Sequence, residues 1–173
     1  MRKTVGITIK KSDPVFDDLR WVLKARGAKE KYREQLQCLC VQVLDAVCTD
    51  GRRLHIAKCE GLQAFIPEGA WEVVVNTVSK IVLLQADVKF PDYTAVIPDL
   101  SHPHSTVQVF HGSSEACFRA ARHGVALDHK YVEDAVGKER CELHLFDENN
   151  PAYIQSRNRT AIVMPLRLEM KGQ

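Results

Sequence analysis

The side chains that could bind a metal or move a proton in this sequence include a group of histidines. His102 and His104 flank a proline, and His111 follows a short distance later. Imidazole is a common zinc ligand, but no cysteine stands at zinc-site spacing from these three residues. Because Ser, Pro and Asp surround the histidines, we expect a solvated loop and no metal site.

Neighbouring carboxylates could supply general acids and bases, but their pattern is typical of solvated faces and turns. The pairs are Asp17-Asp18, Glu133-Asp134 and Asp147-Glu148. The sequence contains no nucleophile elbow, no P-loop and no HExxH motif. We therefore expect a protein that is not an enzyme and needs no cofactor. Because a triad assembled in space leaves no local motif, an enzyme of unrecognised type stays open as an alternative.

The six cysteines are scattered without any CxxC pair. Most of them stand inside apolar segments, where cysteine behaves as a small hydrophobic residue, so we expect buried, reduced thiols. The start of the sequence is basic, but its apolar stretch is too short and too regularly alternating for a signal peptide. No run reaches the roughly 18 apolar residues of a membrane span. We expect a cytoplasmic protein without a membrane partner.

The composition is that of an ordinary globular protein. The chain has 173 residues, of which 45% are hydrophobic and 27% charged, and its formal net charge is +2. This length is enough for one domain or two small ones with a core that needs no disulfide or metal. The nearly neutral balance does not indicate a protein that coats nucleic acid by charge alone.

In the first half of the chain, alternating and helical patterns follow one another. A cap at Ser12-Asp13 is expected before the first helix, and Asp50-Gly51 is a strong turn signal. The predicted elements are a strand over 3–10, a helix over 14–26, two strands within 36–48, a strand over 53–59, a short strand over 62–66 and a helix from Pro67 along Trp71, Val74, Val75 and Val78.

The second half repeats the theme of strand, helix and strands. The predicted elements are a strand over 105–110, a helix over 114–123 capped by Ser113-Ser114, a strand over 125–127, a helix from an Asp128 cap to Val136, and strands over 141–146, 152–156 and 160–169. The sequence therefore predicts an α+β fold of repeated strand–helix–strands units, with antiparallel sheets and about four helices.

Three segments together resemble one known family. They are TDGRRL at 49–54, KFPDYTAVIP at 89–98 and AIVMPLRL at 161–168. In order and type they are similar to the TDG-x-R-L turn, the F-P-D-Y-x-x-V-x-P linker and the final V-V-M-P-M-R-L strand of the β subunit of bacterial DNA polymerase III, the DNA sliding clamp. The resemblance implies a DNA-clamp-like fold.

The resemblance also implies a domain organisation. Residues 1–98 look like the second clamp domain with its linker, and residues 99–173 look like a contracted third domain. Sliding clamps have three tandem domains and close into a ring as a dimer, whereas no segment here resembles the first domain. Whether the chain assembles into a homo-oligomer or closes a ring is left open.

In the clamp family the three segments converge on a cleft that receives short peptides of replication and repair proteins. The resemblance therefore implies a hydrophobic peptide groove with an adaptable methionine and a rim of arginines. Its residues would be Thr49, Gly51, Arg52, Leu54, Pro91, Val96, Ile162, Val163, Met164, Pro165, Leu166 and Arg167. Ala95 and Ala161 depart from the family, which often has a basic and an aromatic residue there.

Clamp helices present basic residues to DNA, and the resemblance implies the same for Arg20 and Lys24 in the first helix and Arg119 and Arg122 in a later one. Such contacts would be nonspecific and salt-sensitive, and nearby acids offset them. The leading hypothesis is a clamp-like protein that offers a groove to short peptides of replication or repair proteins. An oligomeric, DNA-encircling processivity factor is the second.

Overall fold

The computed structural model describes residues 6–167, which form two compact units that divide between Asp92 and Tyr93. Each unit is an antiparallel sheet with helices packed on it, so the predicted α+β class is confirmed.

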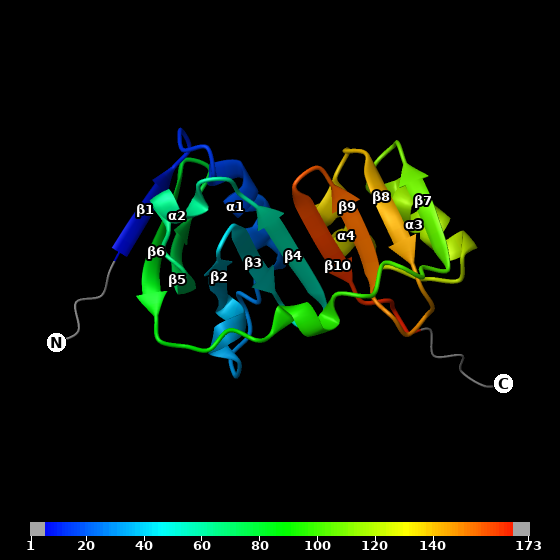
Figure 1. Cartoon of the computed structure of the whole chain (residues 1–173), viewed down its shortest axis with the longest axis horizontal. Coiled ribbons are helices and arrows are strands. Elements are labelled where there is room, and N and C mark those ends of the chain that lie inside the picture. The colour runs from blue at the N-terminus through cyan, green and yellow to red at the C-terminus, as the bar shows by residue number, and fades with distance from the viewer. Residues whose placement is uncertain (1–5, 168–173) are drawn as a thin grey trace. The chain divides into compact units, whose positions relative to one another are not determined.

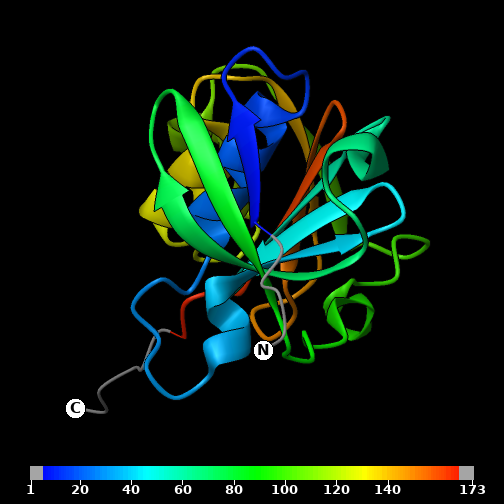
Figure 2. The same ribbon diagram turned by 90° about the vertical axis from the view of Figure 1, so that its left-hand side faces the viewer.

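The first unit contains a sheet of six strands in the order β1-β6-β5-β2-β3-β4 (Figure 1). Every pair of neighbours is antiparallel. Figure 2 looks onto β1 and β6 at the free edge of this sheet. The strands are β1 (Gly6–Lys10), β2 (Cys38–Gln42), β3 (Asp45–Thr49), β4 (Arg53–Lys58), β5 (Gly69–Asn76) and β6 (Lys80–Ala86).

The main helix of the first unit is α1 (Phe16–Val22), which continues into the 3-10 turn η1 (Leu23–Ala25). It packs against β3 and β4 because Leu19 and Val22, one helical turn apart, are completely buried. Two short elements complete the unit, η2 (Glu34–Gln37) and α2 (Leu62–Phe65).

The second unit contains four strands in the order β10-β9-β8-β7, so β7 is its free edge. Its helices α3 and α4 pack against each other and cover one face of the sheet (Figure 1). Leu143, Leu145 and Ile154 alternate with more exposed neighbours and form the core. The elements are η3 (Tyr93–Val96), β7 (Ser105–Val109), α3 (Ser113–Arg122), α4 (His129–Val136), β8 (Cys141–Leu145), β9 (Ala152–Ser156) and β10 (Arg159–Val163).

Most predicted elements are confirmed within a few residues. The helix over 14–26 is α1 with η1, and the segment 36–48 does hold two strands joined by a tight turn. Asp128 caps α4, since its carboxylate accepts from the main-chain N–H groups of Lys130 and Tyr131. Residues 3–5 of the first predicted strand lie outside the described residues.

The predictions for 62–66 and for the helix after Pro67 are wrong. Residues 62–65 form the single helical turn α2, and Gly69–Asn76 is strand β5. Helical spacing is present at Trp71, Val74, Val75 and Val78. The hydrogen bonds of β5 to β2 and β6 nevertheless hold this segment as a strand. The register shifts between Val73 and Val75, so the valine run is a bulged strand.

Four smaller predictions are also wrong. Residues 125–127 are not a strand, and β10 ends at Val163, although residues 168 and 169 lie outside the described part. Pro165 has no N–H to donate, which is incompatible with an extended ladder. The caps predicted at Ser12-Asp13 and at Ser113-Ser114 are not formed: the Asp13 carboxylate accepts from Lys10 N–H, and α1 and α3 both begin without a side-chain cap.

Candidate functional site

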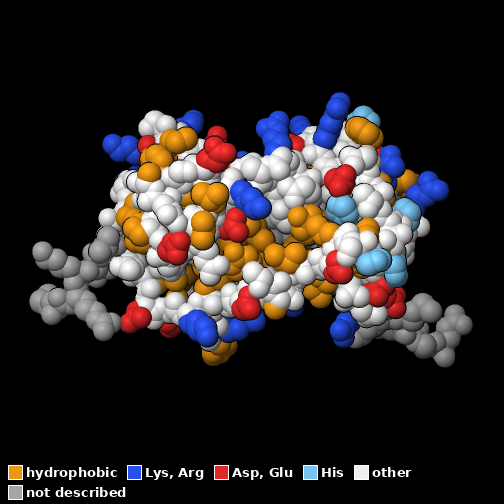
Figure 3. Space-filling view, viewed as in Figure 1, with side chains coloured by type: hydrophobic (Ala, Val, Ile, Leu, Met, Phe, Trp, Pro, Cys, Tyr) orange, Lys and Arg blue, Asp and Glu red, His pale blue; other side chains and the backbone are white. Residues whose placement is uncertain are grey.

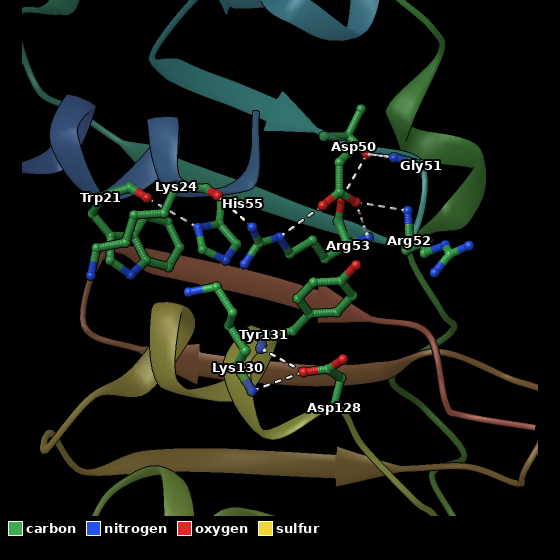
Figure 4. Close-up of polar contacts among 11 residues, drawn as sticks. Trp21, Lys24, Asp50, Gly51, Arg52, Arg53, His55, Asp128, Lys130 and Tyr131 are labelled. Atoms are coloured by element: carbon green, nitrogen blue, oxygen red, sulfur yellow. Dashed lines mark hydrogen bonds and ion pairs between the residues drawn. The ribbon is translucent and has the colours of Figure 1, made fainter. Parts of the chain in front are cut away.

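The turn between β3 and β4 is held by its own side chains (Figure 4). The hydroxyl of Thr49 accepts from Gly51 N–H at 3.0 Å and donates to the carbonyl of Arg53 at 2.7 Å. The Asp50 carboxylate accepts from the N–H groups of Arg52 at 2.9 Å and Arg53 at 3.1 Å. Gly51 has a φ of +89°, a backbone conformation that residues with a side chain rarely adopt. The turn is therefore a fixed structure that leaves Gly51 and Arg52 exposed.

The two arginines of this turn have different environments. Arg53 is buried, with Nε 3.0 Å from Asp50 Oδ2 and Nη2 donating to the carbonyl of Lys24 at 2.6 Å. Arg52 is exposed, and Figure 4 shows its side chain pointing away from Asp50. Arg52 is therefore the arginine of the turn that is available to a partner.

His55 is a buried residue that the sequence reasoning missed. Its ring stacks on Trp21 with centroids 4.2 Å apart, and Nδ1 donates to the Trp21 carbonyl at 3.1 Å. A strand position facing a helix is the only sequence signal for it. With Arg53, it bonds β4 to the main chain of α1 and η1, and so positions the turn.

The segment after β10 turns from buried to exposed within a few residues. Ala161, Ile162 and Val163 are buried in the second sheet, whereas Met164 is 41% and Leu166 47% exposed. The N–H of Leu166 donates to the carbonyl of Ala126 at 2.8 Å, which fixes this segment to its own unit. The chain therefore presents two apolar side chains from a backbone that is tied down.

Further apolar side chains of the second unit are exposed in and after η3. Val96 is 48%, Ile97 37% and Leu100 39% exposed, while Tyr93 at the start of η3 is buried. The N–H of Ile97 donates to the carbonyl of Thr94 at 3.2 Å, which closes the turn.

The predicted peptide-binding residues are divided between the two units. Thr49, Gly51, Arg52, Leu54 and Pro91 belong to the first, and Val96 with residues 162–167 belongs to the second. Leu54, Ile162 and Val163 are buried, so their side chains do not lie on the surface.

Two of the predicted DNA-binding residues are already bonded within the protein, and the other two are exposed. Arg20 donates to the carbonyl of Thr77, and Arg119 forms an ion pair with Glu115 in which Nε and Oε1 are 2.6 Å apart. Lys24 and Arg122 are exposed.

The cysteines are placed as structural residues. Five are buried and Cys117 is half-buried. Burial raises the pKa of the Cys40 and Cys141 thiols to about 11, so neither is a ready nucleophile. Within residues 6–167, no three His, Cys, Asp or Glu side chains are grouped to hold a metal ion. The same residues contain no helix that is both long and apolar enough to cross a membrane.

Comparisons with solved structures find one fold repeatedly, although no protein-family model and no curated protein matches the sequence. The DNA polymerase III β subunit of Thermotoga maritima superposes with a TM-score of 0.62 over 95% of this chain, at 18% identity. The Helicobacter pylori β clamp bound to a DNA ligase peptide gives 0.62 over 97%, at 14% identity. The Caulobacter crescentus polymerase III β protein gives 0.59 over 94%, at 17% identity.

The chain spans about two-thirds of the length of these clamps, with 66%, 67% and 66% of their residues covered. The clamp-like fold predicted from the three sequence segments is therefore confirmed. Over nearly its whole length, this chain has the fold of the bacterial DNA polymerase III β subunit, the DNA sliding clamp.

Proposed function

We propose that this chain is a clamp-like protein that binds short linear peptides of replication or repair proteins. The observation that carries the proposal is the exposure of Met164 and Leu166 directly after the buried strand β10. Each exposed apolar group loses contact with water when a peptide covers it, which stabilises the complex by about 25 cal/mol per Å².

The chemistry of this segment suits a peptide with apolar anchors. Methionine is flexible and polarisable, so it adapts to side chains of different shape. The bond from Leu166 N–H to the Ala126 carbonyl holds the segment before a peptide arrives, which lowers the entropy lost on binding. The exposed Arg167 can pair with a carboxylate of the peptide.

The comparisons support the proposal at the level of the fold. The Helicobacter pylori β clamp, which has the same fold, was solved with a DNA ligase peptide bound. We therefore propose peptide binding as the function.

Other residues contribute to the proposal in two ways. On the second unit, Val96 and the half-buried Pro165 add apolar surface. Ile162 and Val163 anchor the exposed segment from beneath. On the first unit, the exposed residues Gly51, Arg52 and Pro91 and the half-buried Thr49 form a second proposed contact surface, with Leu54 as its buried support.

The test is fluorescence anisotropy with the labelled DNA ligase peptide of the Helicobacter pylori complex and a scrambled peptide as control. The proposal predicts saturable binding with a Kd of about 1–100 μM, which corresponds to roughly 5–8 kcal/mol. Met164→Glu and Leu166→Glu should each weaken binding by about 10-fold or more, since a charge would replace the apolar contact.

Val78→Glu is the matched control, because Val78 is an apolar residue of the first unit that is 76% exposed. It should leave the affinity unchanged. Circular dichroism melting of all three variants separates lost binding from lost folding. If Met164→Glu folds normally and binds as the wild type does, this segment is not the peptide site.

A further inference from the structure

A cleft beside the free edge strand β7 lies apart from the proposed peptide-binding residues. It has a volume of about 710 Å³ and is lined by β7, the loop after it and α3, including Gln108, Phe110, Phe118 and Arg122. A second hollow of about 590 Å³ shares Gln108 and Phe110 and continues along β8 and the turn before β10. Phe110 therefore stands where the two hollows meet.

Two phenylalanines of this surface are exposed, each beside an arginine. Phe110 is 50% and Phe118 62% exposed. The guanidinium carbon of Arg140 lies 5.6 Å from the centroid of the Phe110 ring, and that of Arg122 lies 6.0 Å from the centroid of the Phe118 ring. These are cation–π distances, so each ring and its arginine form a flat, cationic platform.

Among the described residues, three acids line the two hollows, and one of them, Glu139, is exposed and accepts only from the Ser156 hydroxyl, at 3.4 Å. The other two are engaged within the unit. Glu115 accepts from the N–H groups of Phe110 and His111 and pairs with Arg119. Glu142 accepts from Gln108 and lies 2.8 Å from His144 Nε2.

The remaining cations of the lining have no such partner. Within residues 6–167, no ion pair is formed by Arg122, Lys138, Arg140 or Arg157. Figure 3 shows Lys, Arg and His side chains over this unit, at the right of the view, with some Asp and Glu side chains among them. The surface therefore has unneutralised positive charge next to exposed aromatic rings.

We infer that this cleft binds single-stranded nucleic acid, with bases stacked on Phe110 and Phe118 and phosphates paired with Arg122, Arg140 and Lys138. Nonspecific single-strand sites combine a cationic groove with aromatic platforms in this way, and each stacked base contributes strongly whatever its identity. A duplex keeps its bases stacked inside, so it cannot use the rings.

The charges favour this ligand over a second copy of the chain. The other free edge strand, β1, ends in the exposed residues Lys10 and Lys11. β7 itself is uncharged, but a second copy docked there by β1 would add Lys10 and Lys11 to a surface that already has unpaired cations, whereas a phosphate backbone neutralises such cations.

The test is anisotropy of a labelled oligothymidylate of about 20 nucleotides, longer than the roughly 4–16 nucleotides that one small domain covers. We expect binding that weakens steeply with salt, and weaker binding of a duplex of equal length. Phe110→Ala with Phe118→Ala should lower the affinity by about 10-fold or more. Arg122→Gln should lower the slope of log K against log salt by about 0.7.

The matched control is Lys31→Glu with Tyr32→Ala, which removes an exposed cation and a 93% exposed aromatic ring from the first unit. It should bind oligothymidylate like the wild type. The inference is overturned if the wild type does not bind, if the double phenylalanine variant binds equally well, or if the duplex binds as tightly. It is also overturned if sedimentation shows that the phenylalanines hold two copies together. Because Met164 and Leu166 are absent from this site, peptide binding can fail or succeed independently.

Discussion

Asp50 and Arg53 are joined twice, by the side-chain pair of Nε and Oδ2 at 3.0 Å and by the bond from Arg53 N–H to Oδ1 at 3.1 Å. Arg53 also donates to the Lys24 carbonyl. We predict that Arg53→Ala lowers the free energy of unfolding by about 1–3 kcal/mol, because it leaves partly buried acceptors without a donor. Arg52→Ala, one residue away on the exposed side, should change it by less than about 0.5 kcal/mol. Urea denaturation measures both, and equal losses would contradict the separate roles of the two arginines.

Two glycines of the second unit share a positive φ but differ in their surroundings, which provides a test of packing at the start of α3. Gly112 and Gly124 both have a φ of +79°, but a Cβ at Gly112 would lie 2.5 Å from the Gly137 carbonyl oxygen, whereas nothing lies within 4 Å at Gly124. Gly124→Ala should cost about 1–2 kcal/mol of backbone strain. Gly112→Ala should cost clearly more, because α3 and the turn after α4 must move apart. Thermal unfolding of both variants measures the difference in stability. Similar decreases in Tm would mean that α3 and the turn after α4 can move apart at little cost.

The thiols should react in an order that follows their burial. Cys117 is half-buried and the other five are buried, and burial raises the pKa of Cys40 and Cys141 to about 11. We predict that iodoacetamide at neutral pH labels Cys117 first in the folded protein and all six cysteines in urea. Mass spectrometry of the digested protein identifies the labelled sites. Early labelling of Cys40 would show that β2 opens readily.

Glu115 should contribute to the acid sensitivity of the second unit. Its pKa is held below the ordinary value, first by the N–H of Phe110 and also by the N–H of His111 and by Arg119. The folded-state pKa is therefore lower than the unfolded one, so the stabilisation is present above the ordinary pKa and is lost as the pH falls from there through the lower folded-state pKa. Glu115→Gln should show a smaller drop in urea midpoint between pH 7 and pH 4 than the wild type. An unchanged drop would contradict this contribution.

Most of the fold could be predicted from sequence because local signals agreed with tertiary packing. Asp50-Gly51 marks a turn in any context, and Asp128 has the carboxylate that the first N–H groups of α4 need. The failure of the helix predicted from Pro67 to Val78 has a specific cause. The bulge between Val73 and Val75 interrupts the alternation of β5, and the valines then fall at helical spacing by coincidence.

The candidate site could be predicted only in part. The sequence identifies Met164 and Leu166 as apolar, but it does not show that the strand ends at Val163 and leaves them exposed. It also does not distinguish Ile162, which is buried, from Met164, because both are apolar residues near the same proline. The roles of His55 and Arg53 depend on carbonyls of α1 and η1, which are distant in sequence and adjacent only after folding.

The central claim is that Met164 contacts a bound peptide, and methyl NMR measures this directly. The sequence has three methionines, so methionine labelled with ¹³C at the methyl group gives few signals, and Met164→Leu assigns the one of interest. The account predicts that the Met164 signal shifts saturably with the DNA ligase peptide and stays fixed with the scrambled one. If the ligase peptide binds while the Met164 signal does not move, or if the peptide does not bind at all, the proposed function is wrong.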